Sequence, residues 1–488
     1  MKKRHVALAL ALLPTSVLAA DHFLLIGGGP SPRASEAQIE YNVNWVVASL
    51  RDLVPDANIS VFFAGGADAP NTAVELRPRA AEASLPMSAL ASIYGEEGEN
   101  RLLYRAHRVP DVVSSTRRDV LAAELERRLV AMRPGDQAMI IYNGHGSWAS
   151  DRSQNALRLW DESRLSVREF ETLLGRVDPA VPVRFVFTQC YSGAFSRAVY
   201  PKAQPSLLLA SGKRCGFFAE SSERESEGCS ASIELGDYRD YTTYFFAGLT
   251  GKDRLGRPVA AARDRDADGR VSPFDAHLYT LLEGYNGDLP RSTSEDYLER
   301  WMPWYGRWLE TGSVPGNIYG ELAREMARRA GLPEDGRGLG VALTEGYNAL
   351  LREQQGVTAR RGELVRHADS MRLAMQRRLE RRWPMLAAPY TAAYRDILNA
   401  EGDSIEHFAR ADSAFANLRA NEDSISAVDV QLIDLDRRIS RLDKLRRTRM
   451  LARALNLLDR TAARRHRDAY QQLRQCEALP LGKAPPPA

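Results

Sequence analysis

The sequence predicts an α/β fold for roughly the first 320 residues, followed by an all-helical region. Up to about residue 290, short and almost continuously apolar runs alternate with amphipathic stretches, which is typical of a mostly parallel sheet covered by helices on both faces. From about residue 320 the strand-like runs disappear, and Arg, Glu, Ala and Leu recur at helical spacing. A chain of 488 residues is long enough for about two to four domains.

The predicted strands are apolar runs bounded by turn residues or by amphipathic stretches. In chain order they cover residues 22–26, 59–64, 138–142, 183–187, 206–210 and 216–219. Helices are expected at residues 35–53 and 116–132, the second because Thr116-x-x-Asp119 is a helix-start signature. Since ligands gather at the carboxyl ends of parallel strands, the polar residues that follow these strands are the first place to look for chemistry.

These patterns divide the chain into four parts. Residues 1–20 have a basic start, a short apolar run and a small-residue end, which predicts a signal peptide and export to the periplasm or beyond. Residues 21–320 then form the α/β domain, residues 321–480 a helical C-terminal domain and residues 481–488 a Pro-rich tail. In the helical domain, an apolar stripe predicts antiparallel hairpins with an intramolecular core, which is favoured over a zipper with a partner: Leu432, Leu435, Ile439 and Leu442.

The composition excludes several classes of protein. An apolar share of 44% and a charged share of 26% are ordinary for a folded protein and exclude wholesale disorder. The net charge is +3, and Lys2, Lys3 and Arg4 of the predicted signal peptide supply all of it. The mature chain therefore has no global electrostatic attraction to nucleic acid or anionic lipid. No later stretch has about 18 uninterrupted apolar residues, so no membrane span is expected.

Two of the predicted strands end in segments suited to nucleophilic chemistry. The strand at 138–142 leads into Gly-His-Gly with His145 at its centre, and the strand at 183–187 leads within three residues to Cys190. A thiol and an imidazole at neighbouring strand ends form a nucleophile and its base, and the backbone N–H groups of Gly146 and Cys190 are candidate oxyanion donors. A lone Cys is usually a small buried hydrophobe and a lone His a structural group, but their joint occurrence here favours a catalytic pair.

The two segments resemble the His-Gly and Cys blocks of the caspase–legumain clan of cysteine peptidases. The legumain-type branch is nearest, because Cys190-Tyr191-Ser192-Gly193 has its Cys-x-Ser-Gly pattern and the His block precedes the Cys block. The resemblance covers roughly residues 21–290 of the 21–320 domain. It implies a twisted, mostly parallel six-stranded sheet between helices, and endopeptidase activity through a thioester without a cofactor. It also implies that His145 is the base, Cys190 the nucleophile and Gly146 an oxyanion donor.

A third segment bears on specificity. Glu223-Arg224-Glu225-Ser226 resembles the stretch that walls the primary specificity pocket of legumains, which makes Glu225 and Ser226 candidate substrate-binding residues. Legumains place a small residue directly before the nucleophile and an acidic residue two before it, where this chain has Gln189 and Thr188. Both positions border the substrate pocket in that family, so Gln189 is a further candidate. For the same reason, legumain's preference for Asn before the cleaved bond does not carry over.

The four cysteines are Cys190, Cys215, Cys229 and Cys476, and no CxxC pair suggests a zinc site. Cys215 and Cys229 enclose a short loop after the predicted pocket strand. An exported location favours a disulfide bond between them, with two reduced thiols as the alternative. Such a bond would stiffen the specificity loop and leave Cys476 without a partner.

Residues 264–275 match an EF-hand-type calcium loop, with Gly269 at the sharp turn. The expected ligands, at loop positions 1, 3, 5, 7 and 12, are Asp264, Asp266, Asp268, the carbonyl of Arg270, and Asp275. No convincing helix enters the loop, so a dockerin-like half-site with a structural Ca²⁺ is the better comparison. The alternative is an acidic turn that caps the helix after it.

The function predicted from the sequence is an exported cysteine endopeptidase that acts on peptide or protein substrates. Two alternatives stay open. One is a transamidase that uses the same dyad, with an amine instead of water resolving the thioester. The other is a catalytically silent binding or scaffold protein in which the helical domain is the working part. Legumains carry a helical C-terminal prodomain over the active site, and by that analogy residues 321–480 inhibit the enzyme or bind a partner protein.

Overall fold

The computed structural model of the protein describes residues 20–77, 85, 87–95, 100–206, 208–228, 232–259, 263–308, 313–389 and 391–482. The predicted signal peptide, except Ala20, lies outside these residues, and so do Cys229 and residues 483–488 of the predicted tail. Among the helices of the described ranges, none is both long enough and apolar enough to cross a membrane, in agreement with the expectation from hydropathy.

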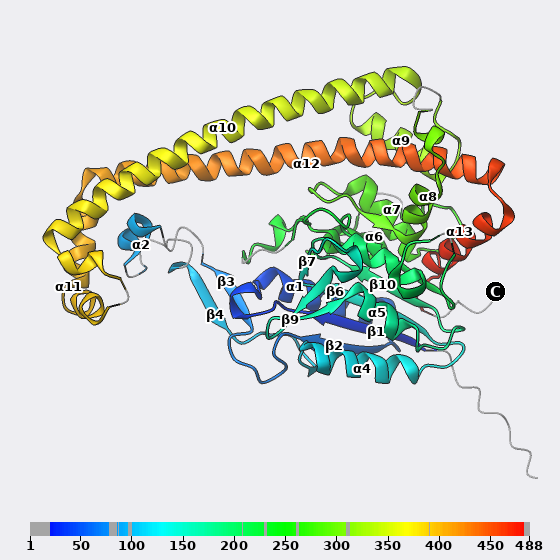
Figure 1. The fold of residues 1–488 in the computed structure, drawn as a ribbon, viewed down its shortest axis with the longest axis horizontal. Coiled ribbons are helices and arrows are strands. Elements are labelled where there is room, and N and C mark those ends of the chain that lie inside the picture. Colours follow the sequence, from blue (N-terminus) through cyan, green and yellow to red (C-terminus); the bar gives the residue numbers. More distant parts are fainter. Residues whose placement is uncertain are drawn as a thin grey trace, which may run out of the picture.

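A seven-stranded sheet forms the centre of the α/β region (Figure 1). In spatial order its strands are β12 (Arg291–Ser292), β11 (Arg214–Phe218), β10 (Val183–Phe187), β6 (Gln137–Asn143), β1 (Asp21–Gly27), β2 (Asn58–Phe63) and β5 (Val112–Ser114). All neighbours run parallel except β11 and β12, which are antiparallel. The predicted α/β class with a mostly parallel sheet is therefore confirmed, but the sheet has seven strands where six were expected.

The strand prediction was wrong at three places. The described part of segment 206–210 forms no strand, because Leu208 is 69% exposed and the N–H of Ala210 donates to the carbonyl of Val199 at 2.8 Å instead of joining a ladder. The two missed strands, β5 and β12, have only 3 and 2 residues. Strands this short leave no apolar run that a sequence pattern can detect.

Helices cover both faces of the sheet. On one face, α1 (Ala37–Leu53) packs on α6 (Tyr241–Thr250), and α6 packs on α7 (Pro273–Glu283). Elsewhere, α4 (Arg118–Val130) packs on α5 (Val167–Leu174). Figure 1 shows α6 and α7 above the sheet and α4 below it.

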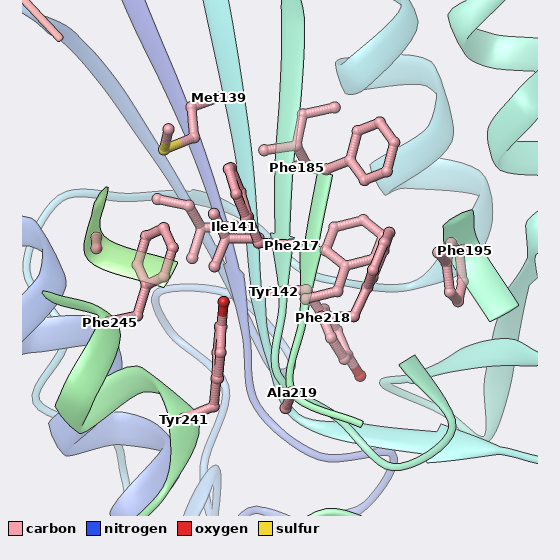
Figure 2. Close-up of a cluster of buried hydrophobic side chains, with 14 of the residues drawn as sticks. Met139, Ile141, Tyr142, Phe185, Phe195, Phe217, Phe218, Ala219, Tyr241 and Phe245 are labelled. Carbon is pink, nitrogen blue, oxygen red and sulfur yellow. The ribbon is translucent and has the colours of Figure 1, made fainter. Parts of the chain in front are cut away.

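Aromatic side chains fill much of the core between the sheet and these helices (Figure 2). The rings of Phe185 and Phe218, from neighbouring strands, lie 5.9 Å apart between centroids. Phe217 points to the other side and lies 5.5 Å from Phe245 of α6. Successive residues of one strand thus point to opposite faces of the sheet, which fixes the register of the strand ends.

Smaller elements surround the main sheet. Strands β3 (Ala73–Leu76) and β4 (Leu102–Arg105) form a hairpin, and β7 (His145–Ser147), β8 (Ala156–Leu159) and β9 (Ser163–Ser166) form an antiparallel sheet that carries His145. The short 3-10 helices are η1 (Pro32–Ala34), η3 (Arg152–Gln154), η4 (Ser192–Val199), η5 (Pro201–Ala203), η6 (Leu235–Asp237), η7 (Trp304–Trp308) and η8 (Pro384–Ala387).

The C-terminal region is helical, as predicted. It contains α9 (Ile318–Arg329), α10 (Gly336–Arg382), α11 (Ala392–Ala411), α12 (Ser413–Thr461) and α13 (Arg464–Glu477), after α8 (Thr293–Trp301) of the α/β region. Figure 1 shows α10 and α12 side by side as a long hairpin that crosses above the sheet. Leu435 and Ile439 of the predicted stripe are buried against Leu350 of α10, so the stripe packs within the chain.

The far end of the hairpin has its own core. There α2 (Ser88–Tyr94), which belongs to the N-terminal half of the chain, packs on α10 and α11. The carboxylate of Glu406 accepts hydrogen bonds from the backbone N–H groups of Ala89 (2.7 Å) and Leu90 (3.1 Å), at the positive end of α2. The hairpin is therefore attached to the rest of the chain at both of its ends.

Near its other end, α12 is joined to the α/β region by a buried ion cluster. Glu295 of α8 lies 3.1 Å from His277 Nε2 of α7 and 2.8 Å from the Arg447 guanidinium of α12. Burial alone would raise the pKa of Glu295, but His277 and Arg447 together lower it to about 2. The cluster ties three helices together as long as Glu295 is ionised.

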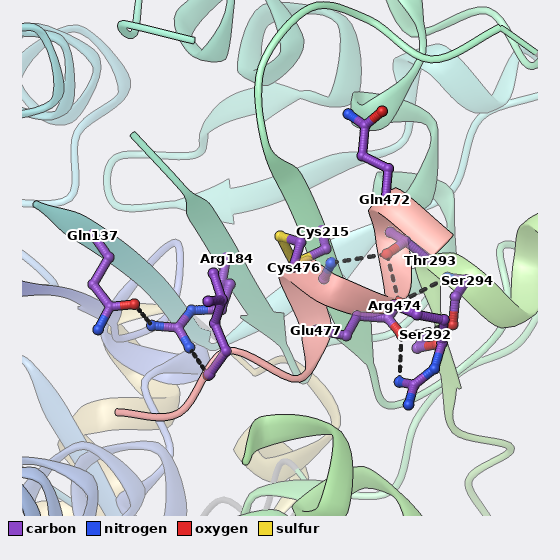
Figure 3. The surroundings of a disulfide bond; sticks show 12 residues. Gln137, Arg184, Cys215, Ser292, Thr293, Ser294, Gln472, Arg474, Cys476 and Glu477 are labelled. Carbon is purple, nitrogen blue, oxygen red and sulfur yellow. Dashed lines mark hydrogen bonds and ion pairs between the residues drawn. A yellow bond between two sulfur atoms is a disulfide. The ribbon is translucent and has the colours of Figure 1, made fainter. Parts of the chain in front are cut away.

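A disulfide bond joins the last helix to the central sheet (Figure 3). Cys215 of β11 is bonded to Cys476 of α13, with Cα atoms 5.9 Å apart. The prediction that Cys215 pairs with Cys229 was therefore wrong. Cys215 is fully buried, on a strand on which α13 packs, so its partner comes from 261 residues away in the sequence. Next to it, the Glu477 carboxylate accepts hydrogen bonds from Thr293 and Ser294, so polar contacts also hold α13 against the start of α8.

Candidate active site

The sheet brings the two predicted strand ends to one edge. Tyr142 of β6 is paired with Phe187 of β10, and His145 and Cys190 each follow three residues later. The N–H of Thr188 still donates to the carbonyl of Tyr142 at 3.2 Å, so the two chains leave the sheet together. The strand order reverses between β1 and β6. In such sheets, ligand sites usually lie at the carboxyl ends of the strands next to this reversal.

Glycines on both sides of His145 are required by this packing. A Cβ on Gly144 would lie 2.6 Å from the Tyr142 hydroxyl and 2.7 Å from the carbonyl oxygen of Gly28. A Cβ on Gly146 would lie 2.0 Å from the carbonyl oxygen of Cys190. The backbone at Gly146 therefore touches the backbone of Cys190, and the two blocks that the sequence singled out are in contact.

The ring of His145 is held by a carboxylate that the sequence analysis missed. Its Nε2 lies 2.9 Å from Glu36 Oε2 and 2.9 Å from the carbonyl oxygen of Ala34. Both side chains are about four-fifths buried, with 20% of His145 and 19% of Glu36 exposed. Glu36 directly precedes α1, where the helix dipole favours a negative charge. One feature of the sequence could have pointed to Glu36: it follows the carboxyl end of β1, the strand beside β6.

Asn143, the buried last residue of β6, does not contact His145 through any bond of the described residues. Its side-chain oxygen accepts from Thr242 (2.7 Å), Asn42 (3.2 Å) and Thr188 (3.3 Å). This buried network joins α1, α6 and the strand that leads to Cys190. It fixes the floor of the site without touching the imidazole.

Cys190 is half-buried and is not part of a disulfide bond. Its sulfur lies 3.8 Å from the hydroxyl and 3.9 Å from the carbonyl oxygen of Ser226, whose hydroxyl also bonds the carbonyl of Thr188 at 3.0 Å. The predicted pocket residue Ser226 is thus in contact with the predicted nucleophile.

The residue after the nucleophile has an unusual backbone. Tyr191 has a φ of 60°, in the left-handed region that non-glycine residues rarely adopt, and this turn starts η4. Its hydroxyl donates to Glu225 at 2.9 Å, and partial burial and the Glu225 carboxylate both raise the pKa of Tyr191. Glu225 therefore helps to hold the turn that presents Cys190.

Gln189 occupies a different place from the one expected. Its side chain is only 1% exposed and lies under Gly146, and neither of its amide atoms has a hydrogen-bond partner among the described residues. A side chain sealed in this way packs the two blocks together and does not line an open pocket, so its assignment as a substrate contact is corrected.

A cavity of about 660 Å³ opens beside the nucleophile. One wall comes from the loop that contains Glu225 and Ser226, and another from Gln38 in the first turn of α1, two residues after Glu36. The opposite wall belongs to α10 and α12 of the helical hairpin, with Gln354, Leu432 and Asp436 among its residues. Ser226, which contacts the sulfur of Cys190, thus connects the cavity to the candidate nucleophile.

The acidic loop is only partly arranged for a cation. Carboxylate oxygens of Asp264, Asp266 and Asp268 lie within 4.8 Å of one another. Burial raises the pKa of Asp266, and the nearby Asp275 and Asp268 raise it further, while Arg474 offsets only part of this effect. For Arg270, the structure shows its N–H donating to Asp268 at 2.8 Å.

Asp275 departs from the predicted ligand set. It is fully buried, and its carboxylate accepts from the Ser272 hydroxyl (2.6 Å), the Ser272 N–H (2.9 Å) and the Arg265 N–H (2.8 Å). Together with Ser272 it forms a capping box at the start of α7. Because these donors occupy both oxygens, the expected bidentate closure by Asp275 is replaced by helix capping.

Comparisons with known proteins add little. No family model matches the chain, and no curated protein matches it. Among the solved structures that match is the crystal structure of protein GSU0716 from Geobacter sulfurreducens, with 11% identity and a TM-score of 0.34 over 56% of this chain and 92% of that chain. A score this low carries no argument about fold or function.

Proposed function

We propose that this protein is an exported cysteine endopeptidase in which Cys190 is the nucleophile and His145 the general base. The observation that carries the proposal is the contact between the two strand-end blocks. Gly146, next to His145, lies against the carbonyl of Cys190, on neighbouring strands whose residues pair three positions earlier. A thiol and an imidazole at adjacent strand ends, beside a cavity, are the arrangement that thiol-dependent acyl transfer requires.

In the proposed reaction, the imidazole Nδ1 takes the proton of the Cys190 thiol, and the thiolate attacks the carbonyl carbon of the scissile amide. The resulting oxyanion is stabilised by the backbone N–H groups of Gly146 and Cys190. The tetrahedral adduct collapses as the imidazolium gives its proton to the leaving amine, which leaves a thioester. Water, deprotonated by His145, then attacks the thioester, and the acid is released as the thiol is restored.

Glu36 supports this scheme by orienting the base. Nε2 of His145 is shared by two oxygen acceptors, Glu36 and the carbonyl of Ala34, so the proton of the neutral ring belongs on Nε2. In this tautomer Nδ1 is the basic nitrogen. The carboxylate also stabilises the imidazolium that forms when the thiol is deprotonated.

Two further expectations belong to the same proposal. The predicted signal peptide places the enzyme outside the cytoplasm, and the disulfide between Cys215 and Cys476 is of the kind that persists in oxidising compartments. Asp264, Asp266 and Asp268 would hold a structural Ca²⁺, whose charge would relieve the repulsion among their clustered carboxylates.

The test is labelling and cleavage with the mature chain. A thiol-directed activity probe should label wild-type protein, and the label should be lost in Cys190→Ala and strongly reduced in His145→Ala. Cleavage of a peptide library should show the same dependence, and added amine nucleophiles separate hydrolysis from transamidation in the products. Labelling that persists in Cys190→Ala, with no cleavage of any peptide, would remove the assignment.

A further inference from the structure

The cavity beside the nucleophile is lined by an excess of negative charge. Five carboxylates line it, against only two guanidinium groups: Glu225, Glu227, Asp237, Asp240 and Asp436 against Arg239 and Arg437. Its volume of about 660 Å³ is ample for one long side chain. The question is which of these charges are already neutralised inside the protein.

Three of the five carboxylates are engaged. Glu227 pairs with Arg437, which neutralises that guanidinium as well. Asp240 accepts from Asn42 at 2.7 Å and lies 3.3 Å from the Arg254 guanidinium, which is outside the cavity wall. Glu225 accepts from the Tyr191 hydroxyl.

Two carboxylates keep their capacity to bind. No hydrogen bond or ion pair with a described residue engages the carboxylates of Asp237 and Asp436. Asp237 is exposed, while Asp436 is half-buried, and burial raises the pKa of Asp436 above its usual range. Arg224 and Arg437 offset part of this effect by lowering the pKa of Asp436, but neither forms a hydrogen bond or ion pair with its carboxylate among the described residues. A partly desolvated carboxylate of this kind is stabilised further by a cation that enters beside it.

The position of the cavity connects this charge to the candidate reaction. Ser226 lines the cavity and contacts the sulfur of Cys190. A side chain that enters the cavity therefore belongs to a residue next to the attacked bond. The absence of a side chain at Gly287 leaves room for the Asp436 carboxylate, because a Cβ there would lie 2.6 Å from Asp436 Oδ2.

We propose that this cavity binds the basic side chain, Arg or Lys, of the substrate residue at the cleavage site, with Asp436 of α12 as a specificity-determining carboxylate. The inference rests on the proposed function and deepens it in two ways. It names the substrate class as peptides cut beside a basic residue. It also makes the helical hairpin a wall of the recognition site, since α12 supplies Asp436 and Leu432.

The test compares matched peptides on the full mature chain. Fluorogenic peptides that differ only in the residue before the cut carry Arg, Lys, citrulline, Asn or Leu; citrulline has the shape of Arg without its charge. Wild-type kcat/KM should favour Arg over citrulline by about 10- to 150-fold, the ratio that a hydrogen bond to a charged group supplies. Asp436→Asn should remove most of this preference and leave the rate of Cys190 alkylation by iodoacetamide unchanged. Asp429→Asn, a control on the same helix whose carboxylate pairs with Arg361 outside the cavity, should keep the preference.

A binding measurement keeps the two proposals separate. In Cys190→Ala, acetyl-arginine amide should bind more tightly than acetyl-citrulline amide by calorimetry, and Asp436→Asn should abolish the difference. Cleavage that depends on Cys190 but treats Arg and citrulline alike overturns the cavity assignment and leaves the peptidase standing. Selective binding of the arginine amide without any Cys190-dependent cleavage supports the cavity and overturns the peptidase. Equal binding of the two amides overturns the cavity assignment in either case.

Discussion

The contact between Glu36 and His145 gives the sharpest prediction about the dyad. Glu36→Gln keeps the size of the side chain and a possible acceptor oxygen, but it removes the negative charge 2.9 Å from Nε2. Both side chains are about 80% shielded from water, so the interaction is only moderately screened by solvent. A hydrogen bond to a charged group contributes about 1.5–3 kcal/mol. If the imidazolium forms only in the reaction, this energy is lost from the transition state, and kcat falls by about 10- to 150-fold.

The measurement is steady-state hydrolysis of one peptide by wild type and variant, with thermal melting as the check on folding. We expect kcat to fall while KM stays within about twofold, because Glu36 contacts the base and not the substrate. Glu36→Asp should recover part of the lost rate. Glu162→Gln is the matched control, because Glu162 pairs with Arg158 beside the strands that carry His145 and does not contact the imidazole. A Glu36→Gln protein that is folded and as active as wild type would refute the orienting role.

The remaining predictions concern stability. Cys476→Ser should lower the free energy of unfolding by about 2–4 kcal/mol in urea titrations, and added reductant should have the same effect on wild type but none on the variant. Because the pKa of Glu295 is lowered to about 2, its ion cluster stabilises the fold at pH above about 4.5, and this contribution of roughly 3 kcal/mol is lost as the pH falls from about 4.5 to about 2. Glu295→Gln should flatten that part of the stability curve, and an unchanged curve would contradict the assignment. Added CaCl₂ should raise the melting temperature of wild type but not of Asp266→Asn, whereas Asp275→Asn should lower it by the loss of a helix cap with or without calcium.

Much of the sheet could be predicted because strands that are buried on both faces consist almost entirely of apolar residues. The apolar runs at 22–26, 59–64, 138–142, 183–187 and 216–219 all became strands, within a few residues of their expected bounds. Polar contacts were harder to foresee. Thr116 does not cap α4; its hydroxyl donates to the carbonyl of Ala64 at 3.2 Å and accepts from the N–H of Trp160 at 3.2 Å.

The candidate site was predictable only in the part that lies directly after strands. His145, Gly146 and Cys190 share one edge because their strands are neighbours and their offsets are equal. Glu36 was missed because its role depends on where the loop after β1 turns, which no local pattern encodes. The partner of Cys215 was missed for a similar reason, since a contact across 261 residues is set by the docking of α13 and not by spacing.

The bond between Cys215 and Cys476 has a consequence for limited proteolysis. A single cut anywhere between these residues, including in the long hairpin, produces two fragments that stay joined by the bridge. Such a nicked molecule would migrate as one band on a denaturing gel until a reductant is added. A single cut, of the kind by which some enzymes shed an inhibitory segment, would therefore not release the helical hairpin here; its release would require reduction or a second cut before Cys476.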